Sequence, residues 1–214
     1  MRNKFDMQLE QLNKELINMG ELCEEAIGKA AQALREGSVI KAREMIAADE
    51  EIDQMEKEIE RMCLKLLLQQ QPVAGDLRQI SAALKMITDM ERTGDQAADI
   101  AEIILSAKMV GKTDVREINE MAAAVSKMVT NSVAAYVYKD LELARQVIEA
   151  DDRIDAMFDQ IKGLLIEWIT TGQQNGTAID LIMVTKYLER IGDHATNIAE
   201  WVEFSITGVH IDRN

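Results

Sequence analysis

Two pairs of acidic residues, each spaced by four positions, are the side chains in this sequence best suited to do chemistry. Glu91 and Asp95 occur in the stretch DMERTGD, and Glu189 and Asp193 occur in the stretch YLERIGD. Residues four apart lie on one face of an α-helix, one turn above the other. Carboxylate oxygens on adjacent turns can bridge one or more hard cations.

A second set of acids has the same spacing and lies earlier in each half of the chain. Asp49 and Asp53 belong to the stretch ADEEID, and Asp151 and Asp155 belong to ADDRID. These pairs fall on the flank of the apolar stripe of their helices. If each of these helices neighbours the helix that carries the later pair, four carboxylates in each half converge on one site.

The acids of the later helix interrupt its core-facing stripe. On a helical wheel, Glu91, Asp95 and Glu102 share an arc with apolar residues, which are Ile80, Leu84, Ile87, Ala98 and Leu105. Nearer the opposite side lie Arg78, Lys85, Arg92 and Gln96. Like charges one turn apart repel each other, and unpaired carboxylates on a packed face are strongly penalised. A multivalent cation would remove this conflict, so we predict a metal site.

A glycine lies between the two acids of each later pair, at Gly94 and at Gly192. Glycine costs about 1 kcal/mol relative to alanine inside a helix, so its presence at both positions indicates a spatial requirement. We expect another helix, or a metal cluster, to approach closely there.

Two alternatives exist for these acids. They could form an ordinary solvated face, because Arg92 or Arg190 could neutralise the acid three residues later. They could instead belong to a ferritin-like, carboxylate-bridged metalloenzyme, but that class requires Glu-x-x-His motifs that the chain lacks. His194 points away from the acid stripe and is interpreted as a surface residue.

Because no nucleotide-binding loop, nucleophile elbow or zinc-type cysteine pair is present either, the sequence predicts a protein that is not an enzyme.

The chain repeats itself with an offset of about one hundred residues. Residues 84–104 align with 182–202, and ADEEID aligns with ADDRID. The order of the segments is the same in both halves. The sequence therefore predicts a tandem duplication, with a first unit at 1–110 and a second unit at 111–214.

Turn signals divide each unit into three long helical segments. The breaks lie at 35–38, 69–76, 138–140 and 170–177, and a linker joins the units at 108–114. Short turns between long helices place sequential neighbours antiparallel. We therefore predict an all-α fold of two tandem, pseudo-symmetric three-helix bundles with six long antiparallel helices. One long coiled coil is the alternative that the turns and the repeat disfavour.

The charge of the chain restricts its partners. With 38 acidic and 24 basic residues, the formal net charge is −14, which opposes non-specific binding to nucleic acid or to an anionic membrane. No apolar run approaches the ~20 residues of a membrane-spanning helix, and the N-terminal stretch lacks the apolar core of a signal peptide. Cys23 and Cys63 are expected to be buried free thiols. We expect a cytoplasmic protein that attracts cations or basic partner surfaces.

The paired stretches LERIGDHATNIAE (188–200) and MERTGDQAADIAE (90–102), with ADEEID and ADDRID before them, resemble the PhoU family of accessory regulators of phosphate-specific transport. The similarity extends over essentially the whole chain and includes QPVAGDLRQI (71–80). It implies a cytoplasmic, usually dimeric protein of two three-helix bundles.

The resemblance also implies metal ligands, because some members of the family bind multinuclear clusters of iron or other metals through E(D)-x-x-x-D acids. In this sequence these acids are Glu91, Asp95, Glu189 and Asp193. Asp99 occupies a further turn whose counterpart is Asn197, so we expect the two sites to differ. The second unit also has GTAIDLIM in place of P-x-A-x-D-L-R. Iron or zinc is the favoured metal, and manganese, calcium and magnesium stay open.

The role that the resemblance implies is inhibitory signalling. In plentiful phosphate, the family is thought to link the ATPase subunit of the phosphate ABC transporter to a membrane sensor histidine kinase. This link keeps the phosphate-starvation response off and restrains phosphate uptake. A purely structural helical interaction module is the alternative that the residues alone leave open.

Overall fold

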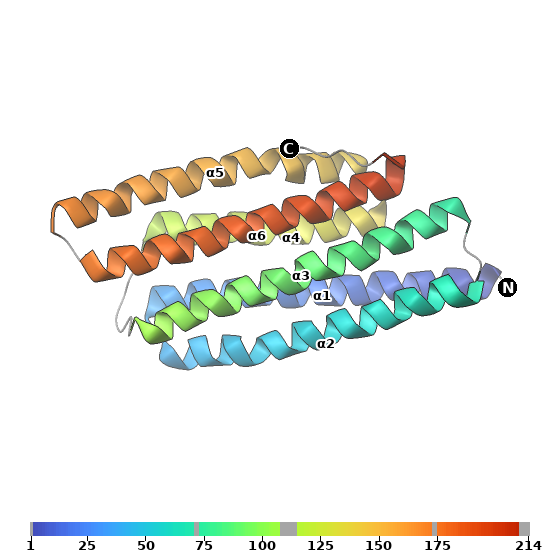
Figure 1. Cartoon of the computed structure of the whole chain (residues 1–214), viewed down its shortest axis with the longest axis horizontal. Coiled ribbons are helices and arrows are strands. Elements are labelled where there is room, and N and C mark those ends of the chain that lie inside the picture. The colour runs from blue at the N-terminus through green and yellow to red at the C-terminus, as the bar shows by residue number, and fades with distance from the viewer. Residues whose placement is uncertain (1, 71–72, 108–114, 173–174, 210–214) are drawn as a thin grey trace.

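The computed structural model describes residues 2–70, 73–107, 115–172 and 175–209, and these ranges contain six α-helices and no strand (Figure 1). The helices are α1 (Arg2–Glu36), α2 (Val39–Gln70), α3 (Ala74–Ser106), α4 (Arg116–Tyr138), α5 (Leu141–Thr170) and α6 (Asn175–Thr207). The linker predicted at 108–114 lies outside the described residues. The predicted all-α fold is confirmed.

The six helices form two three-helix bundles that lie side by side (Figure 1). Helices α1, α2 and α3 all contact one another, and α4, α5 and α6 do the same. Two further contacts, between α3 and α6 and between α1 and α4, join the bundles. The prediction of two tandem three-helix bundles is therefore confirmed, and the bundles share an interface that runs along their length.

The two bundles are related by a pseudo-two-fold rotation. In Figure 1, α3 and α6 run antiparallel beside each other in the centre, α2 and α5 flank them, and α1 and α4 lie behind. A half-turn about the viewing direction therefore exchanges the two units. This arrangement places both helices that carry an E-x-x-x-D pair in the same central layer.

The interior consists mainly of aliphatic and methionine side chains contributed by all six helices. Fully buried examples are Leu16, Ile59, Met86, Val125 and Val202. Burying one such side chain contributes about 1.5–3 kcal/mol, so the apolar stripes decide which face of each helix turns inward. None of the described helices combines the length and the uncharged apolar stretch that crossing a bilayer requires. The same stripes fix where the acids between them must lie.

The first turn within each unit reverses the chain in a left-handed conformation. Gly37 has φ 61° after α1, where glycine carries no steric penalty. Lys139 has φ 53° at the matching position after α4, and it is the one described non-glycine residue with positive φ. The next residue, Asp140, caps α5 by accepting a hydrogen bond from the Leu143 amide at 3.0 Å. These turns make sequential helices antiparallel.

Close helix approach explains the glycines between the paired acids. A Cβ atom at Gly94 would lie 2.6 Å from Asp49 Oδ1 and 2.9 Å from Ile52 Cδ1, both on α2. A Cβ atom at Gly192 would lie 3.1 Å from Ile154 Cγ2 on α5. The structure thus agrees with the expectation that a neighbouring helix approaches at both positions, and the approach is closer in the first unit.

Alanine substitutions at two helical glycines should separate helix propensity from this close contact. Gly28 on α1 is exposed, and a Cβ atom there would meet nothing within 4 Å. We expect Gly28→Ala to raise the free energy of unfolding by about 0.5–1 kcal/mol. Gly94→Ala should gain clearly less, or lose stability, because Asp49 and Ile52 must move. Chemical denaturation of both variants measures the difference, and equal gains would contradict the close contact.

Candidate metal centre

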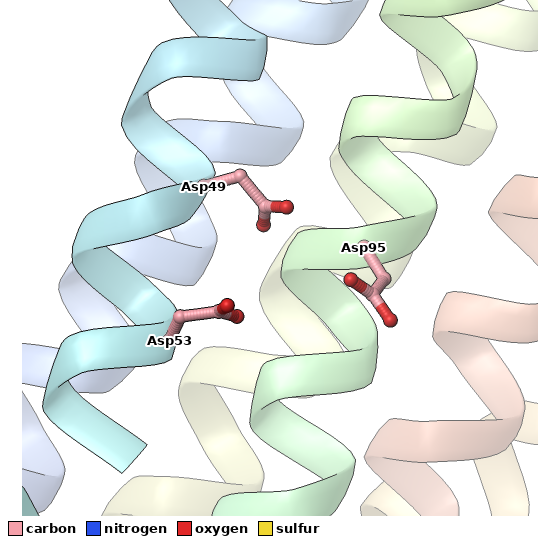
Figure 2. A group of neighbouring side chains, drawn as sticks. All are labelled: Asp49, Asp53 and Asp95. Atoms are coloured by element: carbon pink, nitrogen blue, oxygen red, sulfur yellow. The ribbon is translucent and has the colours of Figure 1, made fainter. Parts of the chain in front are cut away.

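Asp49, Asp53 and Asp95 bring three carboxylates together between α2 and α3. One oxygen atom of each lies within 4.8 Å of the others. Figure 2 shows Asp49 and Asp53 extending from consecutive turns of α2 towards α3, where Asp95 lies opposite them. Gly94, next to Asp95, is the residue that lets α2 come this close. We call these three residues the aspartate triad.

Asp49 is the member of the triad with a buried oxygen atom that lacks a hydrogen-bond partner among the described residues. Its Oδ1 atom is buried and accepts no hydrogen bond within the described part of the chain. Burial raises the pKa of Asp49 to about 6, and the negative charges of Asp95, Asp53 and Asp99 add to the effect. A buried carboxylate oxygen without a donor costs free energy. A bound cation would supply the missing interaction.

Further acids surround the aspartate triad. Glu91 and Asp99 lie one turn before and one turn after Asp95, and neither belongs to the triad itself. Partial burial is the main cause of a raised pKa at both residues, and the charge of Asp95 contributes to each. Glu102, which shared their arc on the wheel, is exposed. The negative charge around the triad therefore extends over about three turns of α3.

Glu56 belongs to this neighbourhood although the sequence analysis did not single it out. It lies on α2, accepts a hydrogen bond from Thr88 Oγ1 at 3.5 Å, and adds to the negative charge around Glu91. Partial burial is the main cause of its raised pKa. Its spacing of seven residues from Asp49 puts both on one helix face, a signal that could have identified it.

Two exposed cations of the protein reach the edge of this acidic group. Arg92 Nη1 lies 3.2 Å from Asp95 Oδ2, and Arg92 Nε lies 3.5 Å from Glu91 Oε2. Lys57 Nζ lies 4.0 Å from Asp53 Oδ2. Exposed ion pairs of this kind contribute little free energy, about 0–1 kcal/mol each. Neither cation forms an ion pair with Asp49, so the buried oxygen of the triad stays uncompensated within the described residues.

The geometry of the aspartate triad fits a cation. Two oxygens bound to one ion can lie up to about 5.2 Å apart at the bond length of 2.6 Å found with calcium, and up to about 4.4 Å apart at 2.2 Å. Ligand atoms within 4.8 Å of one another therefore reach a larger ion directly, and a smaller ion after at most a slight inward movement. The ligand set consists of oxygen atoms only and is half-buried. Iron, zinc, manganese, calcium and magnesium all accept carboxylate ligands, with different preferred geometries. The residues present therefore suit a metal ion.

Two of the corresponding acids of the second unit are more open, whereas Asp151 and Glu189 are half-buried. Asp155 and Asp193 are exposed, and no three acids in the described ranges of this unit bring ligand atoms as close as the triad does. Glu189 forms an ion pair with Lys186. Asp151 and Asp193 line a cavity of about 400 Å³, together with Asp152, Thr196, Asn197 and Glu200. Burial is the main cause of a raised pKa at Asp151.

Residues of α6 that break the pseudo-symmetry join the two units. His194 Nδ1 lies 2.9 Å from Asp89 Oδ1 on α3, and Asn197 Nδ2 donates a hydrogen bond to the same oxygen at 3.1 Å. The His194 side chain is 21% exposed, so the predicted surface residue instead contributes to the contact between the bundles. Asn197 stands where the first unit has Asp99, and its amide serves this contact.

Comparison with known proteins assigns both units to one protein family. The family description "PhoU domain" matches this chain twice, over residues 16–104 and 118–202. The chain belongs to the PhoU family. Both PhoU matches contain the acids described above, with the aspartate triad in the first and Asp151, Asp155, Glu189 and Asp193 in the second.

Curated PhoU relatives match along the whole chain. The "Phosphate-specific transport system accessory protein PhoU homolog" of Clostridium acetobutylicum is 38% identical over 216 residues, covering 100% of this chain and 99% of that protein. The protein with the same description from Aquifex aeolicus is 39% identical and covers 87% of this chain and 86% of its own.

Solved PhoU structures share the fold. The crystal structure of PhoU from Pseudomonas aeruginosa has a TM-score of 0.89 and 31% identity, covering 96% of this chain and 100% of that one. The phosphate transport system regulatory protein PhoU from Streptococcus pneumoniae also has a TM-score of 0.89, with 25% identity and coverage of 97% and 99%. The PhoU fold is therefore shared by chains that are only 31% and 25% identical to this one.

The raised pKa of Asp49 predicts how stability varies with pH when no metal is bound. The folded state keeps a proton that the unfolded state releases between the ordinary pKa of 3.8 and the raised value of about 6. The contribution of Asp49 to the free energy of unfolding is therefore largest below pH 3.8 and is lost as the pH rises through about 6.

We expect Asp49→Asn to flatten this pH dependence and to stabilise the chelator-treated protein at pH 7 by about 1 kcal/mol, after allowance for solvent screening. Denaturant titrations across the pH range measure both effects. The exposed Asp6→Asn variant serves as the control. A profile for Asp49→Asn that matches the wild type would contradict this role of Asp49.

Proposed function

We propose that this chain is an accessory protein of phosphate-specific transport. In this role it acts as a cytoplasmic negative regulator of the phosphate-starvation response. The observation that carries the proposal is full-length similarity to a relative described as an accessory protein of that transport system, at 38% identity over 100% of this chain. The shared fold of the PhoU structures supports the same assignment.

The regulatory mechanism in this proposal is that of an adaptor. One partner is the ATPase subunit of the phosphate ABC transporter, and the other is a membrane sensor histidine kinase. A long, rigid pair of bundles suits this role because it offers two pseudo-equivalent faces to two partners. The net charge of −14 favours basic partner surfaces. The adaptor is proposed to work as a homodimer, without binding nucleic acid or inserting into the membrane.

The aspartate triad is proposed to hold a metal ion, with iron or zinc favoured over manganese, calcium or magnesium. When bound, the ion supplies positive charge that neutralises the carboxylates between α2 and α3. Glu91 and Asp99 lie on the adjacent turns and extend the site if more than one ion binds. Asp151, Asp155, Glu189 and Asp193 are proposed as the second site. The exposure of Asp155 and Asp193 and the ion pair between Lys186 and Glu189 favour weaker binding there.

No catalytic activity is proposed, because a ferritin-like enzyme would need histidine ligands beside the carboxylates. A purely structural role for the acids is the second candidate. The contacts of Arg92 with Glu91 and Asp95 favour it, since they give both acids a cation from the protein itself. Direct metal analysis distinguishes the two roles.

Metal binding should depend on the aspartate triad more than on the second unit. We expect Asp49→Asn/Asp95→Asn to lower divalent metal affinity by about tenfold or more, because it removes two charged ligands. Asp151→Asn/Asp193→Asn should have a smaller effect. Calorimetric titration of chelator-treated protein with zinc, iron(II) and manganese measures the affinities, with Glu10→Gln/Glu44→Gln as the control for net charge. Equal, negligible binding by all these proteins would support the structural role.

Adaptor function should be visible as complex formation and as altered gene regulation. We expect the full-length chain to co-purify with the transporter ATPase, and a deletion strain to express phosphate-starvation genes in plentiful phosphate. Expression from a plasmid should restore repression in that strain. Failure to co-purify, together with unchanged expression after deletion, would contradict the adaptor proposal.

A further inference from the structure

The start of α3 lies near the ends of α4 and α6 (Figure 1), and a separate cavity lies among these three helix ends. Its volume is about 260 Å³, and its lining includes Asp76, Arg78, Gln79, Lys139 and Ser205. None of these residues belongs to the aspartate triad or to the acids of the second unit. Four lining residues, Gly75, Asp76, Arg78 and Gln79, belong to the stretch QPVAGDLRQI, for which the metal centre gives no role.

Gln79 is the buried polar group of this cavity. Its residue exposure is only 6%, yet its side-chain amide makes no hydrogen bond within the described part of the chain. Its backbone carbonyl, by contrast, accepts a hydrogen bond from the Tyr136 hydroxyl at 2.8 Å. Its amide atoms are not among the fully buried atoms without a partner, so water or a small molecule in the cavity can reach them. The side chain therefore offers hydrogen bonds to a molecule in the cavity.

Two cations line the same space. The Nε atom of Arg78 is buried and has no acceptor within the described residues. Its guanidinium carbon lies 3.6 Å from where a Cβ atom of Gly208 would stand, so the end of α6 holds it in place. Lys139, the first residue after α4, is exposed. Neither cation forms an ion pair with a described carboxylate, although the chain carries a net charge of −14.

The start of α3 adds further donors. Val73, the N-cap residue, provides no side-chain cap, and the first helical hydrogen bond runs from the Leu77 amide to the Val73 carbonyl at 2.9 Å. The amides before Leu77, including that of Gly75 in the cavity lining, have no acceptor in the helix. The amino end of a helix attracts anions through these amides and through the helix dipole.

We propose that this cavity binds a small protonated oxyanion and that its preferred ligand is inorganic phosphate. The volume of about 260 Å³ is below the roughly 300–1,000 Å³ of pockets that hold drug-sized ligands, which favours a single small ion. Arg78, Lys139, the Gln79 amide and the first amides of α3 donate hydrogen bonds to its oxygens. The site is independent of the metal centre.

Asp76 makes the site selective for an oxyanion that carries a proton. Its carboxylate lines the cavity and can only accept hydrogen bonds when ionised. At neutral pH inorganic phosphate carries at least one proton, which it can donate to Asp76, whereas sulfate has none and is repelled. A phosphate monoester loses its last proton above about pH 6, so it binds less well than inorganic phosphate at neutral pH.

Calorimetric titration of the full-length, chelator-treated protein with inorganic phosphate, sulfate and glycerol phosphate tests this site. We expect saturable binding of one phosphate per chain, and affinity about tenfold or more weaker for the other two ions. Arg78→Gln and Gln79→Leu should each weaken phosphate binding by a similar factor. Arg43→Gln, an exposed arginine on the first turns of α2, should leave it unchanged. Asp76→Asn should bring sulfate affinity close to that of phosphate.

Circular dichroism of each variant separates loss of the site from loss of the fold. Absence of saturable phosphate binding by the wild type would overturn the proposal. The same holds if folded Arg78→Gln and Gln79→Leu both bind as the wild type does, or if Arg43→Gln weakens binding equally. Equal binding of sulfate and phosphate by the wild type would overturn the role of Asp76. Because the protein is metal-free, none of these results depends on the aspartate triad.

Discussion

The close approach of α2 and α3 at Gly94 is the constraint on which the acidic site depends. Asp49 and Ile52 of α2 occupy the space that a Cβ atom at this position would need. The apolar residues around the crossing supply the free energy that holds the helices together. The same packing buries the Oδ1 atom of Asp49, so the unfavourable environment of this oxygen is a consequence of a stable core. A cation that binds the triad therefore also strengthens this helix contact.

Duplication gave both units the same spacing of acids, but the local environment made the two sites unequal. The neighbouring helix approaches Gly192 less closely than Gly94, and Asp155 and Asp193 are exposed whereas Asp53 and Asp95 are half-buried. Lys186 forms an ion pair with Glu189, which partly neutralises the second site. His194 instead contacts Asp89 of the other unit. The first unit thus brings three carboxylates within 4.8 Å of one another, and the second unit uses His194 and Asn197 in the contact with Asp89 of the first.

Charges of opposite sign are kept apart along the bundle. The aspartate triad lies between α2 and α3 along their length, whereas the cationic cavity with Arg78 and Lys139 lies at one end, where three helices start or finish. A helix end provides free amides and a favourable dipole for an anion, and a helix face provides stacked carboxylates for a cation. The same all-α architecture therefore groups carboxylates at one place and hydrogen-bond donors at another, without a loop built for either.

The sequence by itself determined where the helices lie, because helical periodicity and turn residues are local signals. It also determined the duplication, the family and which acids are candidate metal ligands. Only the tertiary structure decided which acids meet. Asp49, Asp53 and Asp95 converge because α2 crosses α3 at a glycine, and a helical wheel has no information about a neighbour's position. The wheel also placed Gln96 away from the core, but it is 8% exposed because α3 packs against α6 as well as against its own bundle. Contacts between the units depend on how two long faces fit, and spacing within one helix does not encode that fit.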